Sequence, residues 1–166
     1  VGTVMSNMGF EKALERAGIR LLRAAVGDRY VLEAMRAGGY RFGGEQSGHV
    51  IDLQRGTTGD GPMTAVTLFS IAAHTRRTLH DLASDLSIYP QVLVNVRVTD
   101  KSIAEHPAVR DAIAAAEREL ANDGRINVRP SGTEPLVRVM VESSDDEQTQ
   151  AVANTVAETI RRFSTP

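Results

Sequence analysis

Three segments in the second half of the chain alternate valine or isoleucine with other residues, and this pattern restricts the fold more than any other feature. A period of two places the apolar side chains on one face of a β-strand and the intervening residues on the other. The apolar members of the three segments are Val92, Val94, Val96 and Val98, then Ile126 and Val128, then Val137, Val139 and Val141. The second half therefore predicts three half-buried strands whose apolar face needs a cover.

Two helical segments can provide that cover. Residues near 107–122 and near 145–162 repeat apolar side chains every three to four positions. The aligned side chains are Val109, Ile113, Ala116 and Leu120 in the first segment and Val152, Val156, Ile160 and Phe163 in the second. Ser144 and Glu147 predict a capping box at the start of the second helix. The order β-α-β-β-α predicts an α+β domain, an antiparallel sheet with two helices on one face.

The first half alternates strand-like and helix-like segments, which predicts an α/β domain with a mixed sheet and helices. Strands are expected near residues 1–5, 19–26, 40–42 and 50–53, and helices near 9–17, near 29–37 and from about Pro62. The side chains expected to form the buried side of the last helix are Val66, Phe69, Ala73 and Leu79.

Residues 85–91 lose this periodicity and include Pro90, which predicts a linker. The expected organisation is a larger α/β domain at residues 1–84, the linker, and a smaller α+β domain at residues 92–166.

Composition excludes several classes of protein. The net charge of −2 implies no broad basic surface and argues against a nucleic-acid partner. The absence of cysteine excludes a disulfide scaffold and a thiolate zinc site, and it favours a cytoplasmic location. Apolar stretches such as residues 64–73 are too short to cross a bilayer, so no membrane partner is expected.

The loop from Pro130 to Pro135 contains no bulky apolar side chain. It is either a plain hairpin connection, because proline, serine, glycine and threonine favour turns, or a cradle for an anion. The candidate phosphate ligands are the hydroxyl and N–H donors of the loop and the two arginines at its bases, namely Arg129, Ser131, Gly132, Thr133 and Arg138. Each charge-assisted hydrogen bond would contribute about 1.5–3 kcal/mol, so physical chemistry allows a phosphate clamp without requiring one.

A second polar loop, residues 43–49, lies between two short strands. Its glycines either merely permit positive φ angles or leave room for a ligand, and their spacing is not that of a dinucleotide-binding loop. Glu45, Gln46, Ser47 and His49 supply hydrogen-bonding groups suited to a polyhydroxylated ligand, although a lone histidine is more often structural. No catalytic triad or metal cluster is recognisable, and Asp60 in residues 58–61 has no companion ligand.

Taken together, these segments resemble the α-D-phosphohexomutases. "GGEQSGH" at 43–49 is similar to the sugar-binding loop of that family, "VGDRYV" at 26–31 to the adjoining loop of its third domain, and "RPSGTEPLVRVMVE" at 129–142 to the phosphate-binding loop of its fourth domain. "TVMSN" at 3–7 and "TGDG" at 58–61 also match. The resemblance, which runs from near residue 1 to about residue 142, implies that the chain corresponds to the third and fourth domains.

The resemblance implies an isomerase that interconverts glucosamine 6-phosphate and glucosamine 1-phosphate, a step toward bacterial cell-wall amino sugars, through a phosphoserine and a bisphosphosugar. Gln46 favours this glucosamine branch over phosphomannomutases and phosphoglucomutases. The family's catalytic serine and its aspartate-rich Mg²⁺ loop are not recognisable here. The chain is therefore expected to hold no catalytic or metal-binding residue and to be inactive alone, with Mg²⁺ belonging to the full-length enzyme. A non-enzymatic anion-binding or interaction module is the alternative.

Carried over by position, the resemblance assigns two groups of ligands. Those for the sugar are Glu45, Ser47 and His49, with Gly27 and Asp28 in the adjoining specificity loop. Those for the phosphate that is not reacting are Arg129, Ser131, Gly132, Thr133 and Arg138. The implied partners are a phosphosugar and the N-terminal domains of the same protein.

Overall fold

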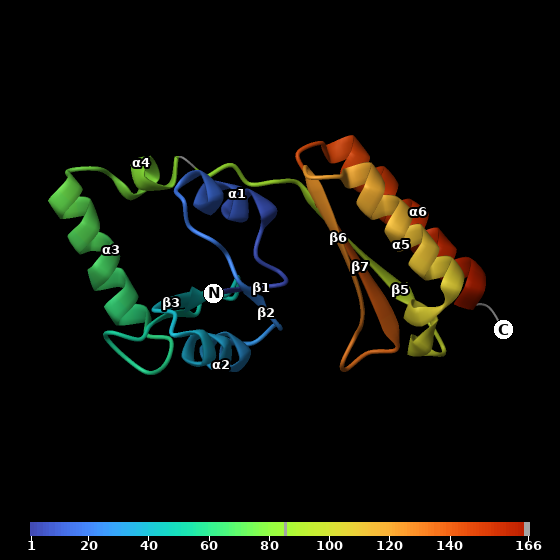
Figure 1. The fold of residues 1–166 in the computed structure, drawn as a ribbon, viewed down its shortest axis with the longest axis horizontal. Coiled ribbons are helices and arrows are strands. Elements are labelled where there is room, and N and C mark those ends of the chain that lie inside the picture. Colours follow the sequence, from blue (N-terminus) through green and yellow to red (C-terminus); the bar gives the residue numbers. More distant parts are fainter. Residues whose placement is uncertain (85, 165–166) are drawn as a thin grey trace. The chain divides into compact units, whose positions relative to one another are not determined.

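The three segments with alternating valines form a three-stranded sheet in the computed structural model of the chain (Figure 1). Strands β5 (Gln91–Arg97), β6 (Gly124–Pro130) and β7 (Leu136–Ser143) lie in the order β5-β7-β6, and both pairs are antiparallel. Val139 of β7 is opposite Val94 on one side and Val128 on the other. Because this register aligns the valines, all three strands present one apolar face, as the sequence predicts.

Helices α5 (Pro107–Leu120) and α6 (Asp146–Ser164) cover that face, and the 3₁₀ helix η1 (Lys101–Glu105) connects β5 to α5 (Figure 1). The buried residues of this core include Val96, Val109, Ala116, Leu120, Val137, Val139, Val141, Val152, Val156 and Ile160. The predicted α+β architecture is confirmed. Phe163, expected in the core, is instead 41% exposed, because it lies in the last turn of α6 and stacks on His106.

The expected capping box at the start of α6 is not formed. The N–H of Gln148 donates to the Asp145 carboxylate at 2.8 Å, whereas the Ser144 hydroxyl donates to the Asp123 carboxylate. Ser144 lies one residue too early to cap the helix, so its hydroxyl bonds to the turn that precedes β6 instead.

The short strands of the first half form two two-stranded sheets, one parallel and one antiparallel. β1 (Gly2–Thr3) is parallel to β2 (Arg23–Ala24), and β3 (Phe42–Gly44) is antiparallel to β4 (Val50–Asp52). The Val1 ammonium donates to the carbonyl of Phe42 and the N–H of Gly44 donates to the carbonyl of Val1, which connects the two pairs. The strands expected at 1–5 and 19–26 are shorter than predicted, since a turn begins at Thr3 and Arg23 is the first paired residue of β2.

Helices α1 (Met8–Arg16) and α2 (Asp28–Gly38) fall where the sequence predicts them. Val31 and Met35 of α2 pack with Ile51 in a small buried core. A Cβ at Gly43 would lie 2.4 Å from the Met35 sulfur, so the absence of a side chain there allows β3 to pack directly on α2.

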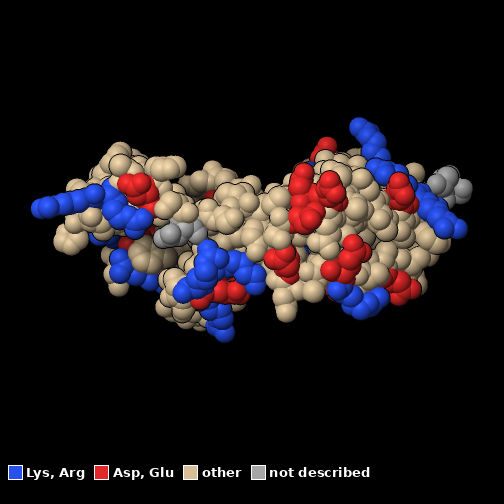
Figure 2. Space-filling model, turned by 90° about the horizontal axis from the view of Figure 1, so that it is seen from above, with Lys and Arg blue, Asp and Glu red and all other residues tan. Residues whose placement is uncertain are grey.

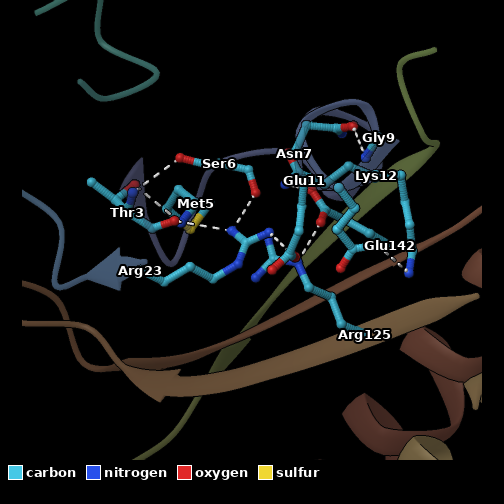
Figure 3. Close-up of polar contacts among 12 residues, drawn as sticks. Thr3, Met5, Ser6, Asn7, Gly9, Glu11, Lys12, Arg23, Arg125 and Glu142 are labelled. Carbon is cyan, nitrogen blue, oxygen red and sulfur yellow. Dashed lines mark hydrogen bonds and ion pairs between the residues drawn. The ribbon is translucent and has the colours of Figure 1, made fainter. Parts of the chain in front are cut away.

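Arg23 joins β2 to the turn before α1 (Figure 3). Its guanidinium donates to the carbonyl oxygens of Thr3 (3.0 Å) and Ser6 (2.6 Å) and pairs with the Glu11 carboxylate at 2.7 Å. The Thr3 N–H donates to the Ser6 hydroxyl, so the "TVMSN" segment is held by side-chain bonds from both ends. This segment is therefore a structural feature of the first unit.

Helix α3 (Gly61–Thr75) begins with Asp60 as its cap and Pro62 in its first turn, and α4 (Leu79–Ala83) follows. The predicted buried side is wrong, because no residue of α3 is buried, and the structure describes all of them. Val66 is 59% exposed and Phe69 is 64% exposed. Ala73 and Leu79 are exposed as well. Apolar side chains occur all round α3, which predicts burial but does not identify a partner surface.

The structure describes residues 1–84 and 86–164 and divides the chain into two units, Val1–Ile88 and Tyr89–Pro166. This boundary falls inside the predicted linker. Residue 85 of that linker and residues 165–166 of the predicted second domain lie outside the described residues. Residues 86–90 form no helix or strand, but Gln91 already pairs with Glu142 in the sheet.

Both signs of charge occur on the visible face of each unit (Figure 2), which agrees with the net charge of −2. Within the part of the chain that the structure describes, no helix is both long and apolar enough to cross a membrane.

Candidate functional site

The loop between β3 and β4 closes on itself through main-chain hydrogen bonds. The N–H of Glu45 donates to the carbonyl of His49, and the N–H of Gly48 donates to the carbonyl of Glu45, both at 3.0 Å. Gly48 has a φ of +98°, a conformation that other residues adopt only with strain. The turn chemistry of the sequence therefore brings residues 45 and 49 together.

Three donors converge on the Glu45 carboxylate. They are the Ser47 hydroxyl at 2.6 Å, the His49 Nδ1 at 3.2 Å and the N–H of Gly27 at 3.0 Å. The Ser47 hydroxyl bond is the largest cause that holds the pKa of Glu45 below its usual value. Burial, the second-largest cause, opposes it, and the bonds from Gly27 and His49 lower the pKa further. Glu45 is therefore an ionised acceptor in a fixed orientation at neutral pH.

The Gly27 contact joins the two segments predicted to bind sugar. Gly27 precedes α2 and has a φ of +125°, and its N–H reaches Glu45 across eighteen positions of sequence. The structure thus brings Gly27, Glu45, Ser47 and His49 together. Asp28 begins α2, and its carboxylate accepts the N–H of Arg29 rather than a bond from this cluster.

The cluster is open to ligands on the histidine side. The His49 side chain is 52% exposed, whereas that of Glu45 is 10% exposed. With Nδ1 directed to Ser47 and Glu45, the ring presents Nε2 for another hydrogen bond. Such a set of neutral and anionic hydrogen-bonding groups suits the hydroxyls of a sugar better than it suits an anion.

The loop between β6 and β7 is held at its base by main-chain bonds. The N–H of Ser131 donates to the carbonyl of Leu136, and the N–H of Leu136 donates to the carbonyl of Glu134, both at 2.9 Å. Ser131 is only 3% exposed, and its oxygen accepts the N–H of Glu134 at 3.3 Å. Its hydroxyl hydrogen remains available for another acceptor.

The tip of this loop leaves donors unused. Gly132 and Thr133 are exposed, and their N–H groups bond to no acceptor among residues 1–84 and 86–164. A Cβ at Gly132 would meet no atom within 4 Å, and its φ is not positive. Neither crowding nor backbone strain therefore explains a glycine at this position.

Two arginines face each other across the strands at the base of the loop. Arg129 of β6 and Arg138 of β7 form a cross-strand pair on the face opposite the valines. Arg138 pairs with Glu134 at 3.0 Å, but its buried Nε has no acceptor, and Arg129 has no hydrogen-bond or ion-pair partner within the described chain. Like charges directly opposite each other destabilise a sheet, and a bound anion would offset this repulsion.

Two further cations lie beside this loop, and the sequence analysis did not identify them. Lys101 of η1 donates from Nζ to the carbonyl of Ser131 at 2.6 Å. Arg97 ends β5 opposite Leu136 and lines a cavity of about 650 Å³ together with Pro135. Arg97 stands between Val96 and Val98, so the alternation itself places it on the same face as Arg129 and Arg138. The position of Lys101 has no such signal.

The described residues contain no cluster of side chains that could hold a metal ion. Nowhere in residues 1–84 and 86–164 do three or more His, Asp or Glu side chains lie close enough together to hold one.

Models of protein families match both units of the chain. Residues 1–89 match phosphoglucomutase/phosphomannomutase, alpha/beta/alpha domain III, and residues 93–159 match the phosphoglucomutase/phosphomannomutase C-terminal domain. The phosphoglucosamine mutase of Streptomyces coelicolor is 56% identical over 162 residues, and that of Staphylococcus saprophyticus is 54% identical over 162 residues. Each alignment covers 97% of this chain and 36% of the relative, so the chain spans about a third of their length.

Solved structures share the fold. The N-acetylphosphoglucosamine mutase of Aspergillus fumigatus superposes with a TM-score of 0.83 at 20% identity, over 99% of this chain and 39% of the fungal chain. A complex of that enzyme with GlcNAc-6P and magnesium superposes with a TM-score of 0.79 at 20% identity, over 96% of this chain and 40% of the other. At this identity the likeness concerns the fold alone.

Proposed function

Because this chain belongs to the phosphoglucomutase/phosphomannomutase family, we propose that it is the phosphosugar-recognition part of a phosphoglucosamine mutase. The full-length enzyme would interconvert glucosamine 6-phosphate and glucosamine 1-phosphate through a phosphoserine and a bisphosphosugar. Relatives of that name at 54–56% identity support the glucosamine substrate over mannose or glucose phosphates.

The loop at 45–49 would bind the sugar. Glu45 would accept hydrogen bonds from sugar hydroxyls through a carboxylate that Gly27, Ser47 and His49 already orient. Orientation before binding lowers the entropy that binding must overcome. Asp28, exposed at the start of α2 next to Gly27, would contribute to the choice of sugar.

The loop at 131–135 would bind the phosphate that is not reacting, and one observation carries this assignment. The loop combines unbonded N–H groups at Gly132 and Thr133 with an unpaired guanidinium at Arg129 in the chain as described. Ser131 and Arg138 would add a hydroxyl and a second guanidinium. A phosphate oxygen needs this combination of fixed dipoles and positive charge.

The chain alone would be inactive, since no group in it is proposed to transfer a phosphoryl group. Magnesium, which a related structure contains together with GlcNAc-6P, would be held by residues elsewhere in the full-length enzyme. We further propose that the enzyme is cytoplasmic and that its partners are the phosphosugar and the N-terminal domains of the same protein, with no nucleic acid or membrane.

An NMR titration of this chain with glucosamine 6-phosphate tests the assignment. Saturable shifts are expected in the amides of residues 44–49 and of residues 131–133, whereas inorganic phosphate should shift only the second group. Mannose 6-phosphate is the control for sugar preference and should bind more weakly. Shifts scattered over both units, or none at saturating ligand, would refute the assignment of the loops and favour a module whose loops are only scaffolding.

A further inference from the structure

Lys101 occupies an unusual place in this chain. The sequence contains seventeen arginines but only two lysines, Lys12 and Lys101. Lys12 is paired with Glu15 on the surface of α1. Lys101 has no carboxylate partner among the residues that the structure describes, and its ammonium group donates instead to the carbonyl of Ser131 at 2.6 Å.

The segment that contains Lys101 holds the loop at both ends. The N–H of Val98 donates to the carbonyl of Pro135 at 3.1 Å, at the far end of the loop from Ser131. The Asp100 carboxylate accepts the N–H of Ser102 at 2.8 Å, which fixes the backbone where η1 begins and from which the Lys101 side chain extends. The two contacts therefore connect β5 and η1 to a loop about thirty positions later in the sequence.

A bond to one carbonyl determines the direction of the next N–H. The peptide between Ser131 and Gly132 is planar and trans, so its C=O and N–H point in opposite directions. Because Lys101 holds the Ser131 oxygen on its side, the Gly132 N–H faces the other way, and no acceptor among the described residues meets it. Glycine restricts the rotation of this peptide plane least, so an external anchor matters most at this position.

We propose that Lys101 is a positioning residue for phosphate binding, because it holds the Ser131 carbonyl and thereby directs the Gly132 N–H at a phosphate oxygen. This proposal rests on the proposed function of the 131–135 loop. Without the ammonium group, the peptide can turn its carbonyl toward the anion, which exchanges an attractive dipole for a repulsive one. The unpaired charge of Lys101 also adds to the attraction from Arg129 and Arg138.

The test compares four forms of the chain by NMR: wild type, Lys101→Met, Lys101→Arg and Lys12→Met. Without ligand, Lys101→Met should change the carbonyl ¹³C shift of Ser131 and the amide ¹⁵N shift of Gly132, while signals of α5 and α6 remain in place. Inorganic phosphate should then bind the Lys101→Met chain roughly tenfold more weakly, as expected for one charge-assisted contact. Lys101→Arg should return to within about threefold of wild type, because it keeps the charge and a donor. Lys12→Met should behave as wild type.

The outcomes separate this proposal from the one that it rests on. A wild-type chain whose amides 131–133 do not respond to phosphate would overturn the proposed function and the role of Lys101 with it. Equal phosphate affinity of wild type and Lys101→Met would overturn the role of Lys101 alone.

A measurement on the wild type guards against misfolding of the variant. The two lysine ammonium groups can be resolved by ¹⁵Nζ spectroscopy, and that of Lys101 should exchange with water more slowly than that of Lys12 and shift when phosphate binds. Equal exchange of the two groups, with no shift, would contradict the proposal.

Discussion

The two polar loops both connect antiparallel strands, yet their polar groups differ in whether they already have hydrogen-bond partners. In the loop at 45–49, one carboxylate already receives bonds from Ser47, His49 and Gly27. In the loop at 131–135, the N–H groups of Gly132 and Thr133 have no acceptor in the described chain. The first loop thus presents a satisfied, anionic surface, and the second presents unsatisfied donors beside cations.

The difference follows from what supports each loop. Main-chain bonds close both loops, but the side chains of the first loop also bond to one another, whereas Lys101 holds the second loop from outside its tip. A loop organised by its own side chains can exchange hydrogen bonds with hydroxyl groups at little cost. A loop organised from outside keeps its donors free for an anion. Counting unused donors and acceptors therefore distinguishes the two more clearly than their compositions, which are similarly rich in glycine and serine.

The largest expected effect is on phosphate binding by the loop at 131–135, here called the cationic loop. Arg129→Ala should weaken phosphate binding by about ten- to a hundredfold, the equivalent of one or two charge-assisted bonds of about 1.5–3 kcal/mol in total. The unfolding free energy should not fall, because Arg129 faces Arg138 and has no partner that the described structure records. Calorimetric titration and urea unfolding measure the two quantities. Arg110→Ala, which removes a surface arginine paired with Glu105, is the control and should leave phosphate affinity unchanged.

A substitution in the loop at 45–49, here called the anionic loop, is expected to reduce stability instead. Glu45→Ala leaves the N–H of Gly27 without its acceptor and removes the carboxylate that Ser47 and His49 share, so it should destabilise the first unit by about 1–2 kcal/mol. Urea unfolding followed on amide signals of residues 1–84 measures this. Glu33→Ala removes an exposed carboxylate that pairs with Arg29 and should cost far less. Equal effects of the two substitutions would show that the cluster has no special role.

Acidification should break the hydrogen bonds that hold the anionic loop together. The pKa of Glu45 is below its usual value in the folded state, so its contribution to stability is complete above that usual value of 4.5 and is lost as the pH falls through the folded pKa. The Gly27 amide should therefore shift as the pH falls below about 5. Ser47→Ala removes the hydrogen bond that lowers the pKa of Glu45 most. The ¹³C titration of the Glu45 carboxylate should therefore move to higher pH. An unchanged titration would refute this origin.

The smallest effect concerns the one carboxylate in the cationic loop. Glu134 pairs with Arg138 and would compete with a phosphate for it. The Glu134 side chain is 55% exposed, so the pair contributes at most about 1 kcal/mol, and Glu134→Gln should strengthen phosphate binding by up to about fivefold. Glu105→Gln, at the pair with Arg110, is the matched control. Weaker binding by Glu134→Gln would mean that Glu134 supports the loop rather than opposing the ligand.

Local periodicity in the sequence determined most of the second unit. The valine pattern predicts three strands with one apolar face, and it also places Arg129 and Arg138 together on the other face, as the register of β6 and β7 confirms. Strand alternation is a property of neighbouring residues, so it can be read without knowledge of distant segments. The polar loop motifs could likewise be located from residues that are adjacent in sequence.

Only the tertiary structure decided which partners the polar and exposed groups find. Lys101 reaches Ser131 across thirty positions and Gly27 reaches Glu45 across eighteen, while Ser144 bonds to Asp123 rather than capping its own helix. The sequence pattern likewise identified α3 as an apolar helix but could not show that its side chains are not buried. The physical reason is that a hydrogen bond depends on distances of about 3 Å between atoms that packing brings together, and packing depends on the whole chain.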